Sequence, residues 1–171
     1  MHAMSFDYEK AMLQGHSFNE YVASVLRQYG VPEVYVPEFT IASTHDAIAD
    51  KTRNEKDIVV DGLVLEVKSR SLVFNSLDDF PLSSILVDTV YGFDQKLIKP
   101  YAYVYISQKT KAMFAIPSSS RQFWTMGMIF DTAKAIEVEC YFVTKRHCRP
   151  FIELVDVLLE RAAQEAEPAC E

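Results

Sequence analysis

The chain has 171 residues, 49% of them hydrophobic and 24% charged, which is typical of one folded domain with a sizeable core over residues 1–171. No apolar run approaches the roughly 20 residues that span a bilayer, so we expect no membrane partner. The net charge of −7 disfavours general affinity for polyanions, so any nucleic-acid surface must be local.

The first residues of the chain and its cysteines indicate where in the cell the protein is located. Residues 1–7 lack the basic and then apolar layout of a signal peptide. The cysteines show no Cys-x-x-Cys spacing and are Cys140, Cys148 and Cys170. We therefore predict neither a zinc site nor a disulfide framework, and a cytoplasmic location. The acidic tail from about residue 165, which contains Pro168, is predicted to fray.

The first predicted element is a helix over residues 7–29 that ends at Gly30. Its apolar residues recur at helical spacing and predict a core-facing stripe. At about 100° per residue, Glu20 lies roughly 200° from Phe18, on the far side of the stripe. Glu20 is therefore expected at the surface, whereas Asn19 lies nearer the edge of the stripe.

A strand and a polar loop are predicted next. Residues 34–41 alternate enough for a strand, and Pro37 places it at an edge or a bulge. Residues 43–56 are polar and lack periodicity, which predicts a loop. The loop contains His45, which is either a proton carrier or a bystander.

A hairpin follows, because Asp61 and Gly62 stand between two aliphatic runs and favour a two-residue type I′ turn. In that register Asp57 lies opposite Glu66, with Cβ atoms roughly 4.5–5.5 Å apart. Lys68 is two residues beyond Glu66 and points to the same face. The hairpin therefore predicts two carboxylates and an ammonium group on one patch.

These residue types suit a hard divalent cation. Two close carboxylates repel unless a cation compensates them, and magnesium prefers carboxylate oxygens with water and phosphate. Such a metal polarises a phosphoryl oxygen and acidifies a bound water, which Lys68 would orient or deprotonate. An exposed hairpin with ordinary surface charges is the alternative. Apolar residues on both faces instead predict a covered strand pair, where uncompensated charge is costly.

The remaining pattern completes the order of elements. Asp88 is expected to cap a helix or lie at the surface. Three tyrosines on one face of the strand over 101–107 either stack bases or pack in the core, and core packing is favoured. The predicted elements are a turn-rich connection over 71–84, a helix over 85–97, strands over 101–107 and 112–116, a helix over 121–136, a strand over 137–144 and a terminal helix from about 150.

The hairpin resembles the signature of the PD-(D/E)xK nuclease superfamily, an acid at the start of one strand and Glu/Asp-x-Lys on the next. Asp57 and the run Glu66, Val67, Lys68 take those places. The resemblance implies that Asp57, Glu66 and the backbone carbonyl of Val67 hold Mg²⁺ or Mn²⁺, and that Lys68 assists the attacking water. It also implies DNA rather than RNA as substrate.

Other residues extend or depart from this resemblance. The family's first helix often supplies a glutamate, for which Glu20 is the candidate. Lys56 stands where the signature has a nominal proline. Basic side chains near the hairpin and near the end are candidate nucleic-acid contacts: Lys51, Arg53, Lys56, Arg70, Lys145, Arg146 and Arg149. A solvated charged face explains the second of these clusters equally well.

The predicted fold is α/β, a restriction-endonuclease-like mixed sheet in αβββαβ order flanked by helices. The predicted function is Mg-dependent hydrolysis of phosphodiester bonds in DNA, and a homodimer would suit cleavage of both strands. One alternative is a nucleic-acid-binding or assembly protein that keeps the nuclease fold without turnover. A second is an α/β interaction protein whose hairpin charges only pair with one another.

Overall fold

The computed structural model describes residues 7–41 and 44–166, so the predictions for residues 1–6, for Cys170 and for the tail beyond Ala166 lie outside it. The helices are α1 (Tyr8–Gln28), α2 (His45–Asn54), α3 (Val90–Gln95) and α4 (Phe151–Ala166), with 3₁₀ turns at Ser118–Phe123 and Lys145–His147. The strands are β1 (Val34–Tyr35), β2 (Ile58–Val60), β3 (Leu63–Arg70), β4 (Ser84–Thr89), β5 (Ala102–Ser107), β6 (Met113–Pro117), β7 (Thr125–Asp131), β8 (Ile136–Thr144) and β9 (Arg149–Pro150).

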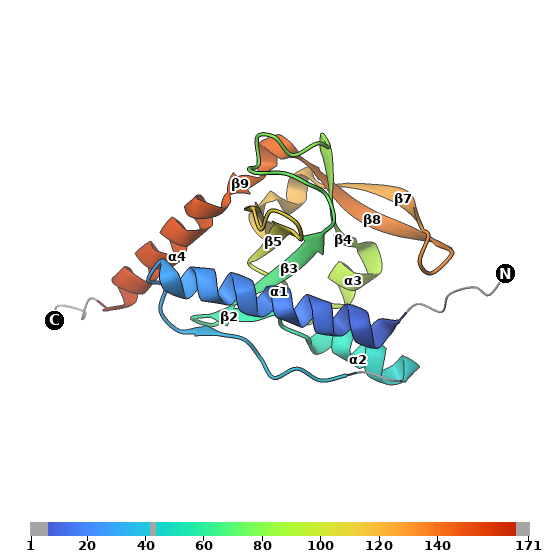
Figure 1. The fold of residues 1–171 in the computed structure, drawn as a ribbon, viewed down its shortest axis with the longest axis horizontal. Helices are drawn as coiled ribbons and strands as arrows, with labels where there is room; N and C mark the ends of the chain where they lie inside the picture. Colours follow the sequence, from blue (N-terminus) through green and yellow to red (C-terminus); the bar gives the residue numbers. More distant parts are fainter. Residues whose placement is uncertain (1–6, 42–43, 167–171) are drawn as a thin grey trace.

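The strands form two sheets, and the predicted mixed α/β class is confirmed (Figure 1). The six-stranded sheet has the order β1-β2-β3-β5-β6-β9, with β3 and β5 parallel and the other pairs antiparallel. The three-stranded sheet has the order β4-β8-β7 and is antiparallel throughout. Within the described ranges, no helix has the length and apolar character needed to cross a bilayer.

Each face of the larger sheet has its own core. On one face, α1 and α4 pack their apolar stripes, and the buried residues include Phe18, Val22, Leu26, Ile58, Leu65, Leu154 and Leu158. On the other face the aromatic residues dominate, and they include Phe74, Phe80, Phe93, Phe114, Trp124 and Tyr141. Tyr103 and Tyr105 of β5 are buried in this second core, so the core interpretation of the tyrosine strand is confirmed for these two.

The predicted hairpin is present with the predicted register. Ile58 pairs with Leu65 and Val60 pairs with Leu63. Asp61 and Gly62 both have positive φ, at 48° and 74°, as a type I′ turn requires. The turn therefore sets Asp57, the residue just before β2, against the middle of β3.

Two predictions upstream of the hairpin were wrong. The strand over 34–41 is only two residues long, β1, and the loop over 43–56 contains the helix α2. The Thr44 side chain accepts a hydrogen bond from the Ala47 N–H at 3.2 Å and caps α2. The polar sequence of this helix has no apolar periodicity, so only its N-cap marks it.

Two predictions downstream of the hairpin were also wrong. The helix over 85–97 is instead β4 followed by the short α3, because Ile85 and Val87 are buried at strand spacing. The helix over 121–136 is instead β7 and the turn into β8. In β7 the exposed Met126, Met128 and Phe130 alternate with less exposed residues, which is a period of two.

Candidate functional site

Asp57, Glu66 and Lys68 meet at β3, one of the two central strands of the larger sheet. The Lys68 ammonium lies 2.6 Å from Glu66 Oε1 on the same strand. The Val67 N–H donates to Asp57 Oδ2 at 2.8 Å, which ties Asp57 to β3 between the other two residues. The structure thus pairs Glu66 directly with Lys68, and it brings Asp57 to the backbone of the residue between them.

Asp57 carries a strongly perturbed carboxyl group. Burial, followed by the charge of Glu66, raises its pKa to about 7, although the hydrogen bond from Val67 opposes this. Asn19 of α1 donates to Asp57 Oδ1 at 3.1 Å, so the residue at the edge of the helix stripe is the one that reaches the site. Burial and the nearby charge of Glu66 thus both disfavour the ionised form of Asp57, and a bound cation would favour it.

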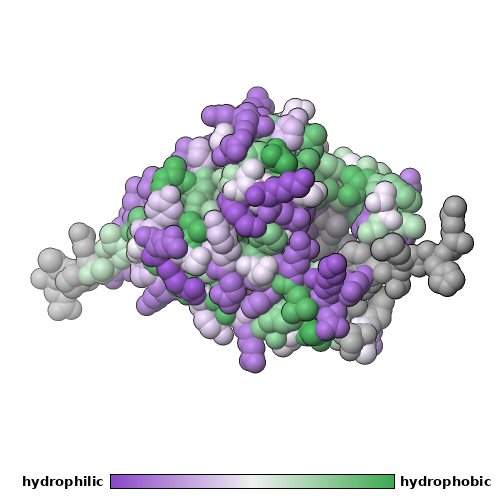
Figure 2. Space-filling model, in the orientation of Figure 1, coloured by the Kyte–Doolittle hydropathy of each residue, from purple (hydrophilic) through white to green (hydrophobic). Residues whose placement is uncertain are grey.

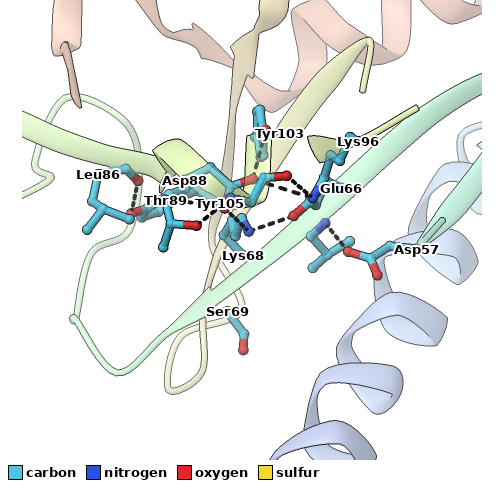
Figure 3. A network of polar contacts seen from close by, with 12 residues as sticks. Asp57, Glu66, Lys68, Ser69, Leu86, Asp88, Thr89, Lys96, Tyr103 and Tyr105 are labelled. Carbon is cyan, nitrogen blue, oxygen red and sulfur yellow. Dashed lines mark hydrogen bonds and ion pairs between the residues drawn. The ribbon is translucent and has the colours of Figure 1, made fainter. Parts of the chain in front are cut away.

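Glu66 and Lys68 belong to a four-charge cluster, completed by Asp88 and Lys96 (Figure 3). Lys68 bridges Glu66 and Asp88 Oδ1 at 2.6 and 3.2 Å. Lys96 bridges Glu66 Oε2 and Asp88 Oδ2 at 3.1 and 3.6 Å. The four side chains are only 8–18% exposed, so the opposite charges largely neutralise one another out of water.

The cluster shifts the pKa values of Lys68 and Asp88. Burial alone would lower the pKa of Lys68, but the charges of Glu66 and Asp88 raise it above its ordinary value. Burial alone would raise the pKa of Asp88, but Lys68 and Lys96 hold it below its ordinary value. Lys68 therefore keeps its proton, which suits hydrogen-bond donation to a water and argues against proton abstraction by Lys68.

Asp88 was predicted to cap a helix or to lie at the surface, and the surface alternative was wrong, because Asp88 is 6% exposed. Its Oδ1 accepts the Thr89 N–H at 2.9 Å at the start of α3, whose N-cap is Thr89. Its Oδ2 accepts a hydrogen bond from the buried Tyr103 hydroxyl at 3.0 Å. No sequence spacing links Asp88 on β4 to Lys96 after α3, so the pattern of the hairpin could not reveal them. Gly92 leaves room for Asp88, because a Cβ there would lie 2.6 Å from Thr89 Oγ1 and 3.1 Å from Asp88 Oδ1.

A cavity of about 900 Å³ opens beside Asp57, between α1, the segment over 35–41 and α2. Asp57 and Val67 line it on the sheet side, Asn19 lines it from α1, and Lys51 and Lys56 line it from α2 and the residues after it. Glu66 and Lys68 are not part of its lining. Asp57 is thus the carboxylate of the site that faces the cavity.

Glu20 and most of the predicted basic contacts lie elsewhere or are already engaged. Glu20 is half exposed, 3.7 Å from His16, and does not reach Asp57. The Arg53 side chain lies outside the described atoms. The other engaged side chains are Lys51 with Glu55, Arg70 over the Tyr105 ring, Lys145 with the carbonyls of Asp78 and Phe80, Arg146 with His147, and Arg149 with Glu153. On the face of the molecule drawn in Figure 2, hydrophilic residues are interrupted by separate hydrophobic patches.

The donor set fits a hard divalent cation, with one obstacle. Asp57, Glu66 and the Val67 carbonyl are oxygen donors on two paired segments of the hairpin, and burial together with the charge of Glu66 raises the pKa of Asp57. The obstacle is that both oxygens of Glu66 already contact ammonium groups. In the part of the chain that the structure describes, no three acidic, histidine or cysteine side chains converge as metal ligands.

Comparison with known proteins adds no relative: no protein-family model, no curated protein and no solved structure matches this chain. The function of the site is therefore argued from its residues and their geometry.

Proposed function

We propose that this protein is a metal-dependent nuclease that hydrolyses phosphodiester bonds, with DNA as the substrate. The observation that carries the proposal is Asp57, raised in pKa to about 7 and bound to the backbone N–H of Val67, between Glu66 and Lys68 on β3, at the edge of a cavity of about 900 Å³. Two carboxylates in that relation call for a cation, and a cavity of this size is within the usual range for ligand sites.

The order of elements supports a restriction-endonuclease-like core. α1, β1, β2 and β3 are followed by α3 and β5, and β5 pairs in parallel with β3. Two elements are added to the αβββαβ order, α2 between β1 and β2, and β4 between β3 and α3. Both additions flank the site: α2 lines the cavity, and β4 carries Asp88.

In this proposal the residues of the site have different roles in the hydrolysis. Asp57, Glu66 and the Val67 carbonyl would hold Mg²⁺, which when bound supplies positive charge toward the phosphate and acidifies water. Lys68, kept protonated by its neighbours, donates a hydrogen bond to the attacking water or stabilises charge on the phosphate. Asn19 orients Asp57 through its amide.

A second candidate is a nucleic-acid-binding or assembly protein that keeps the nuclease fold without turnover. The observation that favours it is the four-charge cluster, in which Lys68 and Lys96 already neutralise Glu66 and Asp88. The same cluster would also suit an α/β interaction protein whose hairpin charges serve only to pair with each other.

Plasmid cleavage in the presence of Mg²⁺ distinguishes these functions. We expect Asp57→Asn and Lys68→Met to lower the cleavage rate by about 100-fold or more, since each removes a group that acts on the reacting phosphate or its water. Glu20→Gln is the matched control, because Glu20 is an acid of α1 outside the site, and it should cleave at the wild-type rate. Circular dichroism checks that each variant is folded. Cleavage that survives both site substitutions would come from a contaminant and would leave the non-catalytic candidate standing.

A further inference from the structure

Lys96 occupies the position of a bridging cation between two carboxylates. Its ammonium is 3.1 Å from Glu66 Oε2 and 3.6 Å from Asp88 Oδ2, while Lys68 takes the other oxygen of each acid. Each carboxylate therefore has one oxygen on each lysine. A metal that used Glu66 Oε2 would need the place that the Lys96 ammonium fills.

The two lysines are held very differently. Lys68 lies within β3, and its ammonium is 5.5 Å from the centre of the buried Tyr103 ring. Lys96 follows α3 and precedes two exposed residues, Leu97 and Ile98, at 74% and 54% exposure. Lys96 lies outside both sheets, and apart from the two acids its ammonium contacts the Gly92 carbonyl of α3 at 3.5 Å. Displacement of the Lys96 side chain would therefore leave the strand pairing of the sheet intact.

Charge balance supports an exchange. Glu66 and Asp88 face the ammonium groups of Lys68 and Lys96, so these four charges already balance one another. A divalent cation on Glu66 would add two positive charges to a cluster whose side chains are only 8–18% exposed. Retaining Lys96 beside the cation would hold like charges together out of water, which is costly. Withdrawal of Lys96 removes one of these positive charges.

We propose that Lys96 is a tethered ammonium that holds the cation position on Glu66, and that a divalent cation binds Glu66 only in exchange for it. This inference rests on the proposed function. It makes Lys96 a competitor for the metal, so the wild-type protein binds the cation more weakly than its carboxylates alone would allow.

Calorimetric titration with Mn²⁺ tests the exchange. Lys96→Met keeps the length of the side chain and removes its charge, and we expect it to bind Mn²⁺ about tenfold more tightly than the wild type or better, given measured couplings of close charge pairs. Lys99→Met is the matched control, because Lys99 follows the same helix but donates only to the carbonyls of Phe93 and Asp94. Its Mn²⁺ affinity should equal that of the wild type.

A second pair of variants tests the exchange if Lys96→Met alone does not fold. The double variant Asp88→Asn with Lys96→Met leaves one carboxylate and one ammonium in the cluster, and it should bind Mn²⁺ about tenfold more tightly than Asp88→Asn alone. Equal or weaker binding after loss of Lys96 overturns the inference and leaves the nuclease proposal intact. Absence of Mn²⁺ binding in every protein overturns the inference together with the metal-dependent function.

Discussion

Asp57 is the residue whose charge the fold opposes most clearly. Its pKa rises from 3.8 to about 7 through burial and the negative charge of Glu66. Lys68 is the opposite case, because its neighbours stabilise its charge and raise its pKa. Glu66 contributes to both shifts, together with burial at Asp57 and with Asp88 at Lys68.

The ionisation of Asp57 predicts a pH dependence of stability. Between about pH 4 and pH 7 the folded protein keeps a proton on Asp57 that the unfolded chain has released, so the free energy of unfolding falls as pH rises. We expect the wild type to lose about 2 to 4 kcal/mol relative to Asp57→Asn across this window. Urea unfolding of both proteins at several pH values measures the difference, in which the other carboxyl groups cancel. A difference in unfolding free energy that does not change with pH would show that folding does not raise the pKa of Asp57.

The sequence could predict the residues that local geometry brings together, and no others. Asp57, Glu66 and Lys68 are set by a two-residue turn, which fixes register within a dozen residues. Asp88 and Lys96 reach Glu66 only through the packing of β4 and α3 onto the sheet. Tertiary contacts of this kind leave no spacing in the sequence, so they appear only in the fold.

At the scale of the elements, the β2–β3 turn holds the site in register, and Gly62 is its critical residue. Its φ of 74° is unfavourable for residues with a Cβ, although a Cβ there would meet nothing within 4 Å. Gly62→Ala should therefore cost about 1 to 2 kcal/mol of unfolding free energy through the backbone alone. Gly15→Ala is the control, because Gly15 lies inside α1 with equally open space, and it should gain about 0.5 to 1 kcal/mol. Urea unfolding measures both, and changes of the same sign would contradict this account.

Elements with a single clear periodicity were predicted, and elements with mixed patterns were not. The stripes of α1 and α4 and the alternation of β5 match the predicted helices and strand. The segment over 85–97 mixes a buried strand with a short helix, so its apolar residues imitate one amphipathic helix. The helix predicted over 121–136 was wrong because β7 exposes several apolar side chains. Their number is similar to that on the apolar side of an amphipathic helix, so composition alone did not distinguish the two.

For the whole molecule, charge is the property that constrains a nucleic-acid substrate. The chain carries a net charge of −7, and Lys51, Lys145 and Arg149 are each held by acids or carbonyls of the protein itself. The molecule therefore offers little general attraction to a polyanion. Attraction has to arise at the site, where a bound divalent cation would neutralise Asp57 and Glu66 and could accept a phosphate oxygen as a further ligand.

Binding of a labelled DNA oligonucleotide should consequently depend on the divalent cation. We expect affinity to rise by about tenfold or more when Ca²⁺ replaces EDTA at constant ionic strength, because the cation bridges the carboxylates and a phosphate oxygen. Asp57→Asn should abolish this enhancement, and Glu20→Gln should retain it, since Glu20 pairs with His16 away from the cavity. Fluorescence anisotropy measures each affinity. Equally tight binding in EDTA, or an enhancement that survives Asp57→Asn, would show that DNA binds away from the hairpin and that its binding does not depend on Asp57.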